Sequence, residues 1–265
     1  MKRKHIIWIV VALLLLTTIA WTIWGNVTVG LTSLEVKEQN LPAAFDGYRV
    51  AHVSDLHNSW LWEKAIDQLR NAQPDVICIT GDLIDSDDID NAFQFVEAAV
   101  QIAPCYFVPG NHEMMVSQET YVRFMQGLED RGVIVLLDQS VMISRDDSQI
   151  CLTGHRCADT TDIGSLTEFD GYNLLLSHRP EAFDDYVAGE YDLVLSGHAH
   201  GGQFRLPLLG GLYAPGQGFL PTYDSGVYTK GVTDLVVSRG IGNSGFPIRF
   251  NNRPEVILIT LRVDT

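Results

Sequence analysis

The chain has 265 residues, of which 46% are hydrophobic and 19% are charged. This balance provides enough apolar material for a packed core, and it excludes both a disordered chain and a small disulfide-stapled scaffold. The formal net charge is −15, from 18 Lys and Arg against 33 Asp and Glu. Because an acidic surface repels polyanions, this charge disfavours general nucleic-acid binding.

The N-terminal segment predicts a membrane-spanning helix. Residues 6–24 carry no charge, and as an α-helix they would extend about 28 Å, which matches the hydrocarbon core of a bilayer. Basic residues at positions 2–4 precede this run, and the first charge after it is Glu35. By the positive-inside rule, the N-terminus lies in the cytoplasm and the rest of the chain outside. We therefore expect residues 1–25 to form a single-pass anchor in the cell membrane.

A cleaved signal peptide is the alternative for this segment, because a basic start followed by an apolar run is common to both. Thr18-Ile19-Ala20 offers a weak cleavage site. Cleavage there would also leave Trp21 and Trp24 exposed on the mature protein. These flanks favour the retained anchor and leave the signal peptide open.

Residues 26–265 contain no repeat and no linker-like tract, which indicates one domain behind a short stalk. Its first part alternates short apolar strands with amphipathic helices. Strands are predicted at 48–53, 75–80 and 105–108, and helices at 61–72, 89–100 and 121–128. After Gly132 the predicted elements are strands, at 133–137, 141–144, 149–153, 173–176, 193–195, 234–237 and 256–261. This order predicts α/β layers around two packed sheets.

Polar segments follow five of these strands. They read SDLHN at 54–58, TGDLID at 80–85, PGNHE at 109–113, SH at 177–178 and SGHAH at 196–200. In open α/β sheets, ligands gather beyond the carboxyl ends of the strands. We therefore expect the five segments to converge on one rim of the domain.

The donor types in these segments indicate a metal site. Asp, His and Asn without thiolate suit Mn²⁺, Fe or Zn²⁺ rather than a structural cysteine site. The D-x-H and H-x-H pairs place both side chains on the same side of a turning backbone, and the carboxylate of Asp82 could bridge two ions. Two ions about 3.5–4 Å apart form the clamp used for in-line displacement at phosphorus.

The five segments form a series of motifs in the order D-x-H, G-D-x-x-D, G-N-H-E, S-H and G-H-A-H. This series resembles the calcineurin-like metallophosphoesterase superfamily. The later segments SRGIG at 238–242 and GFPIRF at 245–250 are similar to its membrane-associated bacterial branch. The resemblance covers roughly residues 30–262. It implies a four-layer α/β/β/α sandwich with two mixed β-sheets, so we expect one N-terminal transmembrane helix (1–25) followed by a metallophosphoesterase domain (26–265).

The resemblance also implies roles for the motif residues. One divalent ion would be held by Asp55, His57, Asp82 and His200, and a second by Asp82, Asn111, His178 and His198. Mn is the first choice for both ions, with Fe or Zn as alternatives, and the family nucleophile is a metal-bridging hydroxide. His112 stands at the family's catalytic histidine, and Glu113, where the family often has Asp, is assigned beside it as an orienting residue.

Substrate contacts are expected at two further positions. Asn58 follows His57 where many relatives have a small residue, and Arg179 follows His178. Arg179, like Arg239 and Arg249, could bind a substrate phosphate or pair with surface acids.

The expected function is hydrolysis of a phosphodiester or pyrophosphate bond by a membrane-anchored, dinuclear-metal phosphoesterase. The anchor favours a lipid-linked substrate, and similar enzymes cleave the pyrophosphate of UDP-linked diacylglucosamine. That substrate lies on the cytoplasmic side, whereas the charge pattern places this domain outside. The alternatives are a broad-specificity phosphomonoesterase and a catalytically silent metal-binding scaffold, and no nucleic-acid or protein partner is expected.

Overall fold

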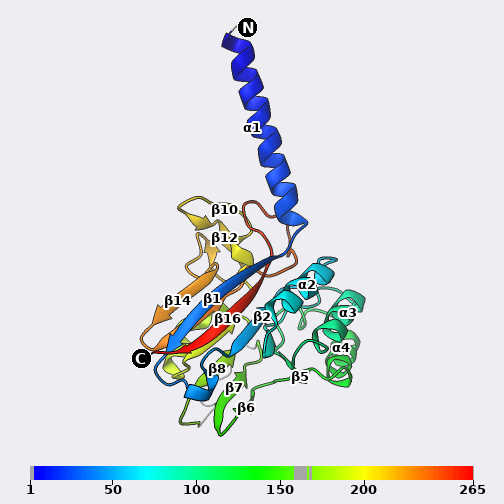
Figure 1. The fold of residues 1–265 in the computed structure, drawn as a ribbon. Helices are drawn as coiled ribbons and strands as arrows, with labels where there is room; N and C mark the ends of the chain where they lie inside the picture. The colour runs from blue at the N-terminus through cyan, green and yellow to red at the C-terminus, as the bar shows by residue number, and fades with distance from the viewer. Residues whose placement is uncertain (1–2, 158–165, 167–168, 265) are drawn as a thin grey trace.

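The protein is built from two β-sheets that pack face to face, with helices on their outer sides (Figure 1). The computed structural model describes residues 3–157, 166 and 169–264. Within this part of the chain, each of the two large sheets has six strands, and both sheets mix parallel and antiparallel pairs. The four-layer α/β/β/α sandwich predicted from the sequence is confirmed.

The first sheet has the strand order β1-β16-β2-β3-β4-β5. Its strands are β1 (Gly30–Glu38), β16 (Glu255–Val263), β2 (Arg49–Val53), β3 (Val76–Ile79), β4 (Cys105–Phe107) and β5 (Ile134–Val135). Its outer face is covered by α2 (Trp62–Ala72), α3 (Asp90–Ala99) and α4 (Gln118–Asp130). Because β2, β3 and β4 run parallel, their carboxyl ends meet at one edge.

The second sheet has the strand order β14-β15-β9-β8-β7-β6. Its strands are β14 (Gly226–Lys230), β15 (Thr233–Val237), β9 (Leu193–Ser196), β8 (Asn173–Leu176), β7 (Ser148–Gly154) and β6 (Gln139–Arg145). The outer layer here is thin, with η3 (Pro180–Ala182) and α5 (Phe183–Ala188). Phe183 and Tyr186 of α5 pack on Leu175 and Val194 of the sheet.

The core between the sheets comes from alternate positions of facing strands. Val50 and Val76 of the first sheet pack against Leu152, Leu174 and Leu195 of the second, and all five are buried. A strand with both faces covered requires apolar side chains on both, which explains the continuous apolar runs that predicted these strands. The strands and helices predicted from residue 48 onward are confirmed to within three residues at each end.

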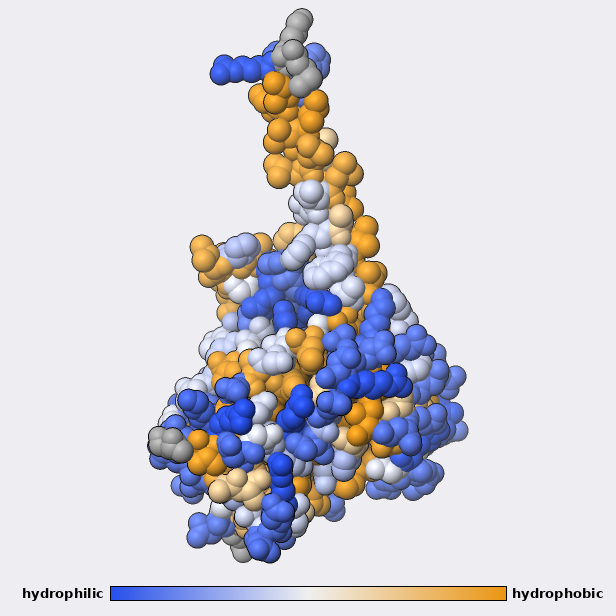
Figure 2. Space-filling model, viewed as in Figure 1, coloured by the Kyte–Doolittle hydropathy of each residue, from blue (hydrophilic) through white to orange (hydrophobic). Residues whose placement is uncertain are grey.

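Helix α1 (Arg3–Asn26) projects from the domain, and its side chains are almost all exposed (Figures 1 and 2). It is long and apolar enough to cross a membrane. Residues 27–29 alone separate α1 from β1. Strand β1 pairs in parallel with β16, which lies more than two hundred residues later in the chain, so nothing in the local sequence indicated its partner.

Two small hairpins project beside the base of α1 (Figure 1). In one, β10 (Arg205–Leu206) pairs with β11 (Gly210–Gly211), and in the other, β12 (Tyr213–Ala214) pairs with β13 (Gly218–Phe219). The short helices η1 (Ala43–Phe45) and η4 (His200–Gly202) complete the described elements. These hairpins are not predictable from the sequence, because two-residue strands among glycines and prolines produce no alternating pattern.

Candidate metal centre

The predicted metal ligands meet at the edge where the carboxyl ends of five strands converge. Each follows directly after a strand, so the parallel strands set its position. The residues are Asp55 and His57 after β2, Asp82 after β3, Asn111 after β4, His178 after β8, and His198 and His200 after β9. Six of them are buried and Asn111 is half-buried. The structure therefore brings all seven together from five separate loops.

The loops at this edge hold backbone conformations that residues other than glycine adopt rarely. The angle φ is positive at Asp55 (53°), His57 (46°), Asp82 (52°), His198 (65°) and His200 (48°). Such conformations persist where surrounding contacts fix them, and they cluster at sites with a function. Their concentration on five ligand positions indicates a functional site whose surroundings hold the backbone in unfavourable conformations.

The first ligand group is Asp55, His57 and His200. The two imidazole Nε2 atoms lie 3.1 Å apart. Asp55 Oδ1 lies 3.3 Å from Nε2 of His200 and 3.8 Å from Nε2 of His57. Three donor atoms from three side chains thus face one point.

The second ligand group is Asp82, His178 and His198. Nε2 of His178 lies 3.1 Å from Asp82 Oδ2 and 3.2 Å from His198 Nδ1. Asn111 Oδ1 lies 3.2 Å from the same His178 Nε2, so it adds a fourth oxygen or nitrogen donor.

The two groups meet at Asp82. Its Oδ2, which contacts His178, lies 3.7 Å from Nε2 of His57 in the first group. In each group two ring nitrogens face each other at hydrogen-bond distance, and a single hydrogen between them would leave other donor atoms of the group unsatisfied. A cation at each point satisfies all the facing atoms, so the residues fit two divalent ions that share Asp82.

Burial and the neighbouring groups together set the charge states at this edge. Burial lowers the pKa of His198 and of His200 to about 3, which leaves both imidazoles neutral. Burial works against ionisation of Asp55 and Asp82, but His200 holds the pKa of Asp55 well below its usual range, and His178 brings that of Asp82 to about 2. Burial also works against protonation of His57 and His178, but Asp55 raises the pKa of His57, and Asp82 raises that of His178 well above its usual value. A protonated ring would release its proton on binding a metal ion, because imidazole binds metals in its neutral form.

The opposite nitrogens of the ligand rings differ in their surroundings. His57 Nδ1 is buried and has no hydrogen-bond partner among the described residues, with Asp85 Oδ2 4.0 Å away. His178 Nδ1, by contrast, lies 2.7 Å from the carbonyl oxygen of Thr80. Contacts of this kind fix the orientation of a metal-binding imidazole.

Gly197 allows the second sheet to approach the first at this point. A Cβ on Gly197 would lie 1.8 Å from Ser54 Oγ and 2.3 Å from Asp55 Oδ2. With glycine there, the backbone N–H of His198 reaches both carboxylate oxygens of Asp55 at 3.1 Å. A side chain at this position would separate the two halves of the site.

His112 lies at the open side of the ligand groups and is half-buried. Its ring meets that of His57 edge to face, with centroids 4.6 Å apart, and its backbone N–H donates to Asp82 Oδ1 at 2.8 Å. Its Nε2 lies 3.3 Å from the hydroxyl of Ser244. Burial lowers the pKa of His112, so the ring is neutral at pH 7.

Glu113 is completely buried and faces the loops rather than the ligands. Its carboxylate accepts from the backbone N–H groups of Gly110 (2.7 Å), Asp82 (2.8 Å), Leu83 (2.7 Å) and Ile84 (3.2 Å). Burial raises its pKa to about 7, and Asp82 adds to the rise, whereas the N–H groups favour the anion. Glu113 therefore ties the β3 loop to the β4 loop and positions Asp82.

The two predicted substrate residues lie at the rim of the site. Asn58 Nδ2 donates to Asp85 Oδ1 at 2.9 Å and to Ser86 Oγ at 3.0 Å. Arg179 Nε donates to Cys157 Sγ at 3.1 Å, and its charge contributes to the low pKa of His198. Both side chains are half-buried, and each directly follows a predicted ligand in the chain.

Glu181 at the site was not identified from the sequence, and Arg249 was considered there only as a phosphate-binding residue or the partner of a surface acid. Glu181 Oε1 lies 3.8 Å from His198 Nε2, and its position three residues after His178 was an available signal. Arg249 is 1% exposed, and its Nη2 lies 3.3 Å from His200 Nδ1. It is thus neither a surface ion pair nor open to a substrate, whereas Arg239 pairs with Glu255.

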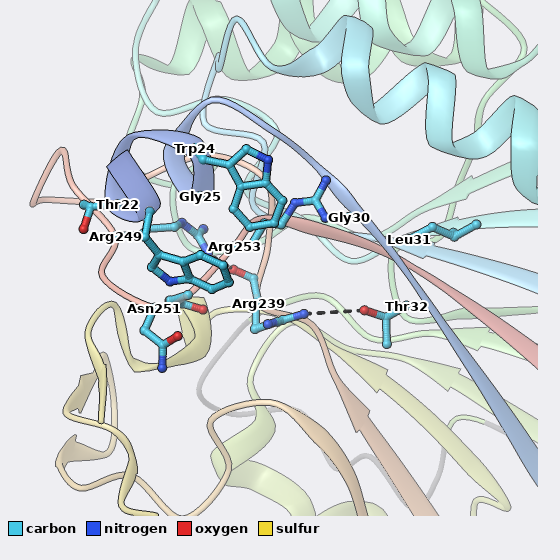
Figure 3. A pocket seen from close by; sticks show the side chains of 12 residues that line it. Thr22, Trp24, Gly25, Gly30, Leu31, Thr32, Arg239, Arg249, Asn251 and Arg253 are labelled. Carbon is cyan, nitrogen blue, oxygen red and sulfur yellow. Dashed lines mark hydrogen bonds between the residues drawn. The ribbon is translucent and has the colours of Figure 1, made fainter. Parts of the chain in front are cut away.

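The end of α1 is fixed to the same loop. Asn26 Nδ2 donates to the carbonyl oxygen of Arg249 at 2.7 Å, and its Oδ1 accepts from the Arg249 N–H at 2.8 Å. Figure 3 shows this junction, a hollow of about 280 Å³, with Trp24 next to Arg253, whose guanidinium lies 4.6 Å from the ring centroid. Because Arg249 contacts His200, one residue links the end of the helix to a predicted metal ligand.

The part of the chain that carries the candidate site matches a known protein family. The family model of the calcineurin-like phosphoesterases matches residues 48–202. This range begins next to β2 and ends just after the loop that carries His198 and His200. It therefore contains every residue of the two ligand groups.

Three relatives cover most of the chain. An uncharacterized metallophosphoesterase of Bacillus subtilis, YkoQ, is 31% identical over 87% of this chain and 89% of its own length. A phosphodiesterase of Escherichia coli, YaeI, is 30% identical over 81% of this chain and 82% of its own length. A transmembrane protein with a metallophosphoesterase domain from Danio rerio is 27% identical over 94% of this chain and 62% of its own length.

Proposed function

The chain belongs to the calcineurin-like phosphoesterase family and is a metal-dependent phosphoesterase, and from this premise we propose that it is a two-metal phosphodiesterase anchored in a membrane by α1. The observation that carries the proposal is the position of Asp82, whose Oδ2 faces imidazoles of both ligand groups. A shared carboxylate holds two ions close enough to act on one phosphate.

The proposed ligands are those of the two groups, with Asn111 added to the second. When bound, two divalent ions supply positive charge for the phosphoryl oxygens and lower the pKa of a coordinated water. The donors are oxygen and nitrogen, a set that suits Mn²⁺, Fe and Zn²⁺, and Mn²⁺ is our first choice.

The chain's own contribution to the reaction centres on His112. Its half-exposed ring stands between the ligand groups and solvent, and the neutral ring can donate a hydrogen bond from Nε2 to a phosphate oxygen. In its protonated form, the same atom would give a proton to the leaving oxygen. Asp82 accepts the backbone N–H of His112 and so fixes the ring relative to the ligands. Glu113 holds Asp82 in place, and we assign it a positioning role.

We propose that the substrate is a phosphodiester or pyrophosphate linked to a lipid. The support is the contact series from Asn26 of α1 through Arg249 to His200, which keeps the ligand groups at the end of the domain that carries the helix. Asn58 and Arg179 border this site and are proposed to contact the substrate outside the reacting phosphate. The basic residues before α1 favour a domain on the extracytoplasmic side, which protease accessibility in intact cells would test.

The test uses the full chain in detergent micelles with a chromogenic phosphodiester and the corresponding monoester, with and without Mn²⁺. We expect metal-dependent hydrolysis that favours the diester. Asp82→Ala removes the shared carboxylate, and activity should fall by at least about 10³-fold, because several kcal/mol of transition-state stabilisation depend on the ions.

Asp184→Ala is the matched control, because that carboxylate is exposed and pairs with Lys230 on the surface. It should leave activity unchanged. Equal activity of the wild type and Asp82→Ala would contradict the proposed site. A preference for the monoester would replace the diesterase with a broad phosphomonoesterase.

A further inference from the structure

Exposed apolar side chains gather around the base of α1. They come from the two small hairpins and from the loop before Arg249, and we call them the apolar rim: Leu208, Leu209, Tyr213, Phe219, Leu220, Phe246 and Ile248. Leu208 is 105% exposed and Phe219 is 84% exposed. Figure 2 shows apolar surface on the projecting hairpins as well as along α1.

The segments that form the rim contain no charge. Residues 206–223 and 240–248 have no Asp, Glu, Lys or Arg, in a chain of which 19% is charged. Insertion of a charged side chain into a bilayer is costly, whereas apolar and aromatic residues are favoured there. Exposure together with this absence of charge fits a lipid surface as the partner.

The first hairpin of the rim lies at the level of the apolar part of α1. Pro207, at the turn of the first hairpin, lines a hollow together with Thr17, Thr18 and Trp21 of the helix. Thr17 lies about 13 Å from Asn26 along the helix axis, at 1.5 Å per residue. Any bilayer that covers the uncharged run of α1 therefore reaches the tip of this hairpin.

The helix and the rim are held to each other by specific contacts. Asn26 makes two hydrogen bonds to the backbone of Arg249, the residue that follows the rim residue Ile248. Arg253 donates to Thr28 Oγ1 at 2.9 Å and to the carbonyl oxygen of Val29 at 2.8 Å. These bonds oppose a swing of the domain away from the membrane about the end of α1.

The rim connects directly to the candidate site. The hydroxyl of Ser244, two residues before Phe246, lies 3.3 Å from Nε2 of His112. Gln203, three residues after His200, donates to the carbonyl oxygens of Phe246 and Ile248 at 2.7 and 3.0 Å. Ser244 thus links the rim to His112, and Gln203 links it to the loop that carries His198 and His200.

We propose that the apolar rim inserts into the interfacial layer of the same bilayer that α1 crosses. The rim is a second attachment to the membrane, and it holds the opening of the metal site against the lipid headgroups. The proposal rests on the proposed function in one respect, namely that α1 remains in the membrane.

The test measures immersion of single side chains in the full-length protein. Leu208→Cys and Phe219→Cys are labelled with a nitroxide and reconstituted in vesicles of phosphatidylethanolamine and phosphatidylglycerol. The four native cysteines are buried, which confines labelling to the introduced thiol. We expect the ratio of collision rates with oxygen to those with a water-soluble nickel complex to be several-fold higher at both positions than at Val232→Cys.

Val232→Cys is the matched control, because Val232 is 75% exposed in the turn between β14 and β15, at the opposite end of the sheet. Leu14→Cys in α1 reports on the anchor itself. A low ratio at Leu14 would overturn the anchor, whereas a high ratio at Leu14 with a Val232-like ratio at Leu208 and Phe219 would overturn the rim alone. Spin–spin broadening at Leu208 that disappears on dilution with unlabelled protein would show that a second copy covers the rim, which would also contradict insertion.

Discussion

Buried acidic residues occur at both ends of the sandwich, and their protonation differs. At the metal end, Asp55 and Asp82 follow the carboxyl ends of strands and lie among imidazoles, with pKa values below their usual range. At the other end, Glu38 closes β1 near Asp192 and Asp234, and the three line a hollow of about 400 Å³. Burial raises the pKa of Glu38 to about 8, and the two aspartates add to the rise.

The contrast shows that buried carboxylates alone do not make a cation site. Burial favours the neutral acid at both ends, and the neighbours decide the outcome. At the metal end, His178 and His200 outweigh burial, so the carboxylates are ionised. The described residues that line the Glu38 hollow include no histidine, so Glu38 takes up a proton instead, and we assign no metal there.

The largest expected difference between the ends is in catalysis. His112→Ala removes the side chain that we propose as the proton or hydrogen-bond donor to the reacting phosphate group, and kcat should fall about 10²–10⁴-fold with a smaller change in KM. Asp234→Asn at the other end should leave kcat within about twofold of the wild type. Steady-state kinetics on a phosphodiester measures kcat for both variants. An equal fall in kcat in the two variants would contradict the proposed difference between the two ends of the sandwich.

The next effect is on stability when metal is removed. Ions that bind only the folded state stabilise it by about 2.7 kcal/mol at one hundred times their dissociation constant, so chelation should lower Tm by roughly 5–10 °C. Thermal unfolding with Mn²⁺ and with a chelator measures the shift. The Glu38→Gln variant should show the same difference in Tm between Mn²⁺ and chelator as the wild type, whereas the Asp82→Asn variant should lose most of this difference. A shift that survives in Asp82→Asn would place the stabilising ions elsewhere.

The smallest effect is a pH dependence at the Glu38 end. Because the pKa of Glu38 is about 8 in the folded protein, against 4.5 for an unperturbed glutamate, its contribution to stability is present below pH 4.5 and is lost as the pH rises to 8. Because glutamine does not ionise, the Glu38→Gln variant should not lose this contribution to stability as the pH rises. The variant should therefore match the wild type at pH 4 and exceed its unfolding free energy by about 1 kcal/mol at pH 9, with allowance for screening by solvent.

Chemical denaturation at the two pH values would measure that difference. A variant that is less stable than the wild type at pH 9 would show that Glu38 is ionised and paired, and the contrast between the two ends would then disappear.

The sequence by itself predicted most of the elements and the seven residues, proposed as metal ligands, that the structure brings together. Strands buried on both faces are apolar throughout, and ligands that follow directly after a strand keep a fixed spacing, so both produce local patterns. Strand β1 was not predicted, because its apolar alternation is short: Leu34 and Val36 are followed by Glu38, which is buried but ionisable. The hairpins beside α1 also escaped prediction, since two-residue strands are too short for periodicity.

The tertiary structure alone decided which residues support the ligands and where the site faces. Glu113 acts through backbone N–H groups from two loops, and Arg249 reaches His200 from 49 residues away. The position of the rim depends on two segments, 206–223 and 240–248, which are separated in the chain by β14 and β15 and come together beside α1. The charge pattern around α1 is local and predicts a membrane helix, but only the strand order places that helix at the metal end.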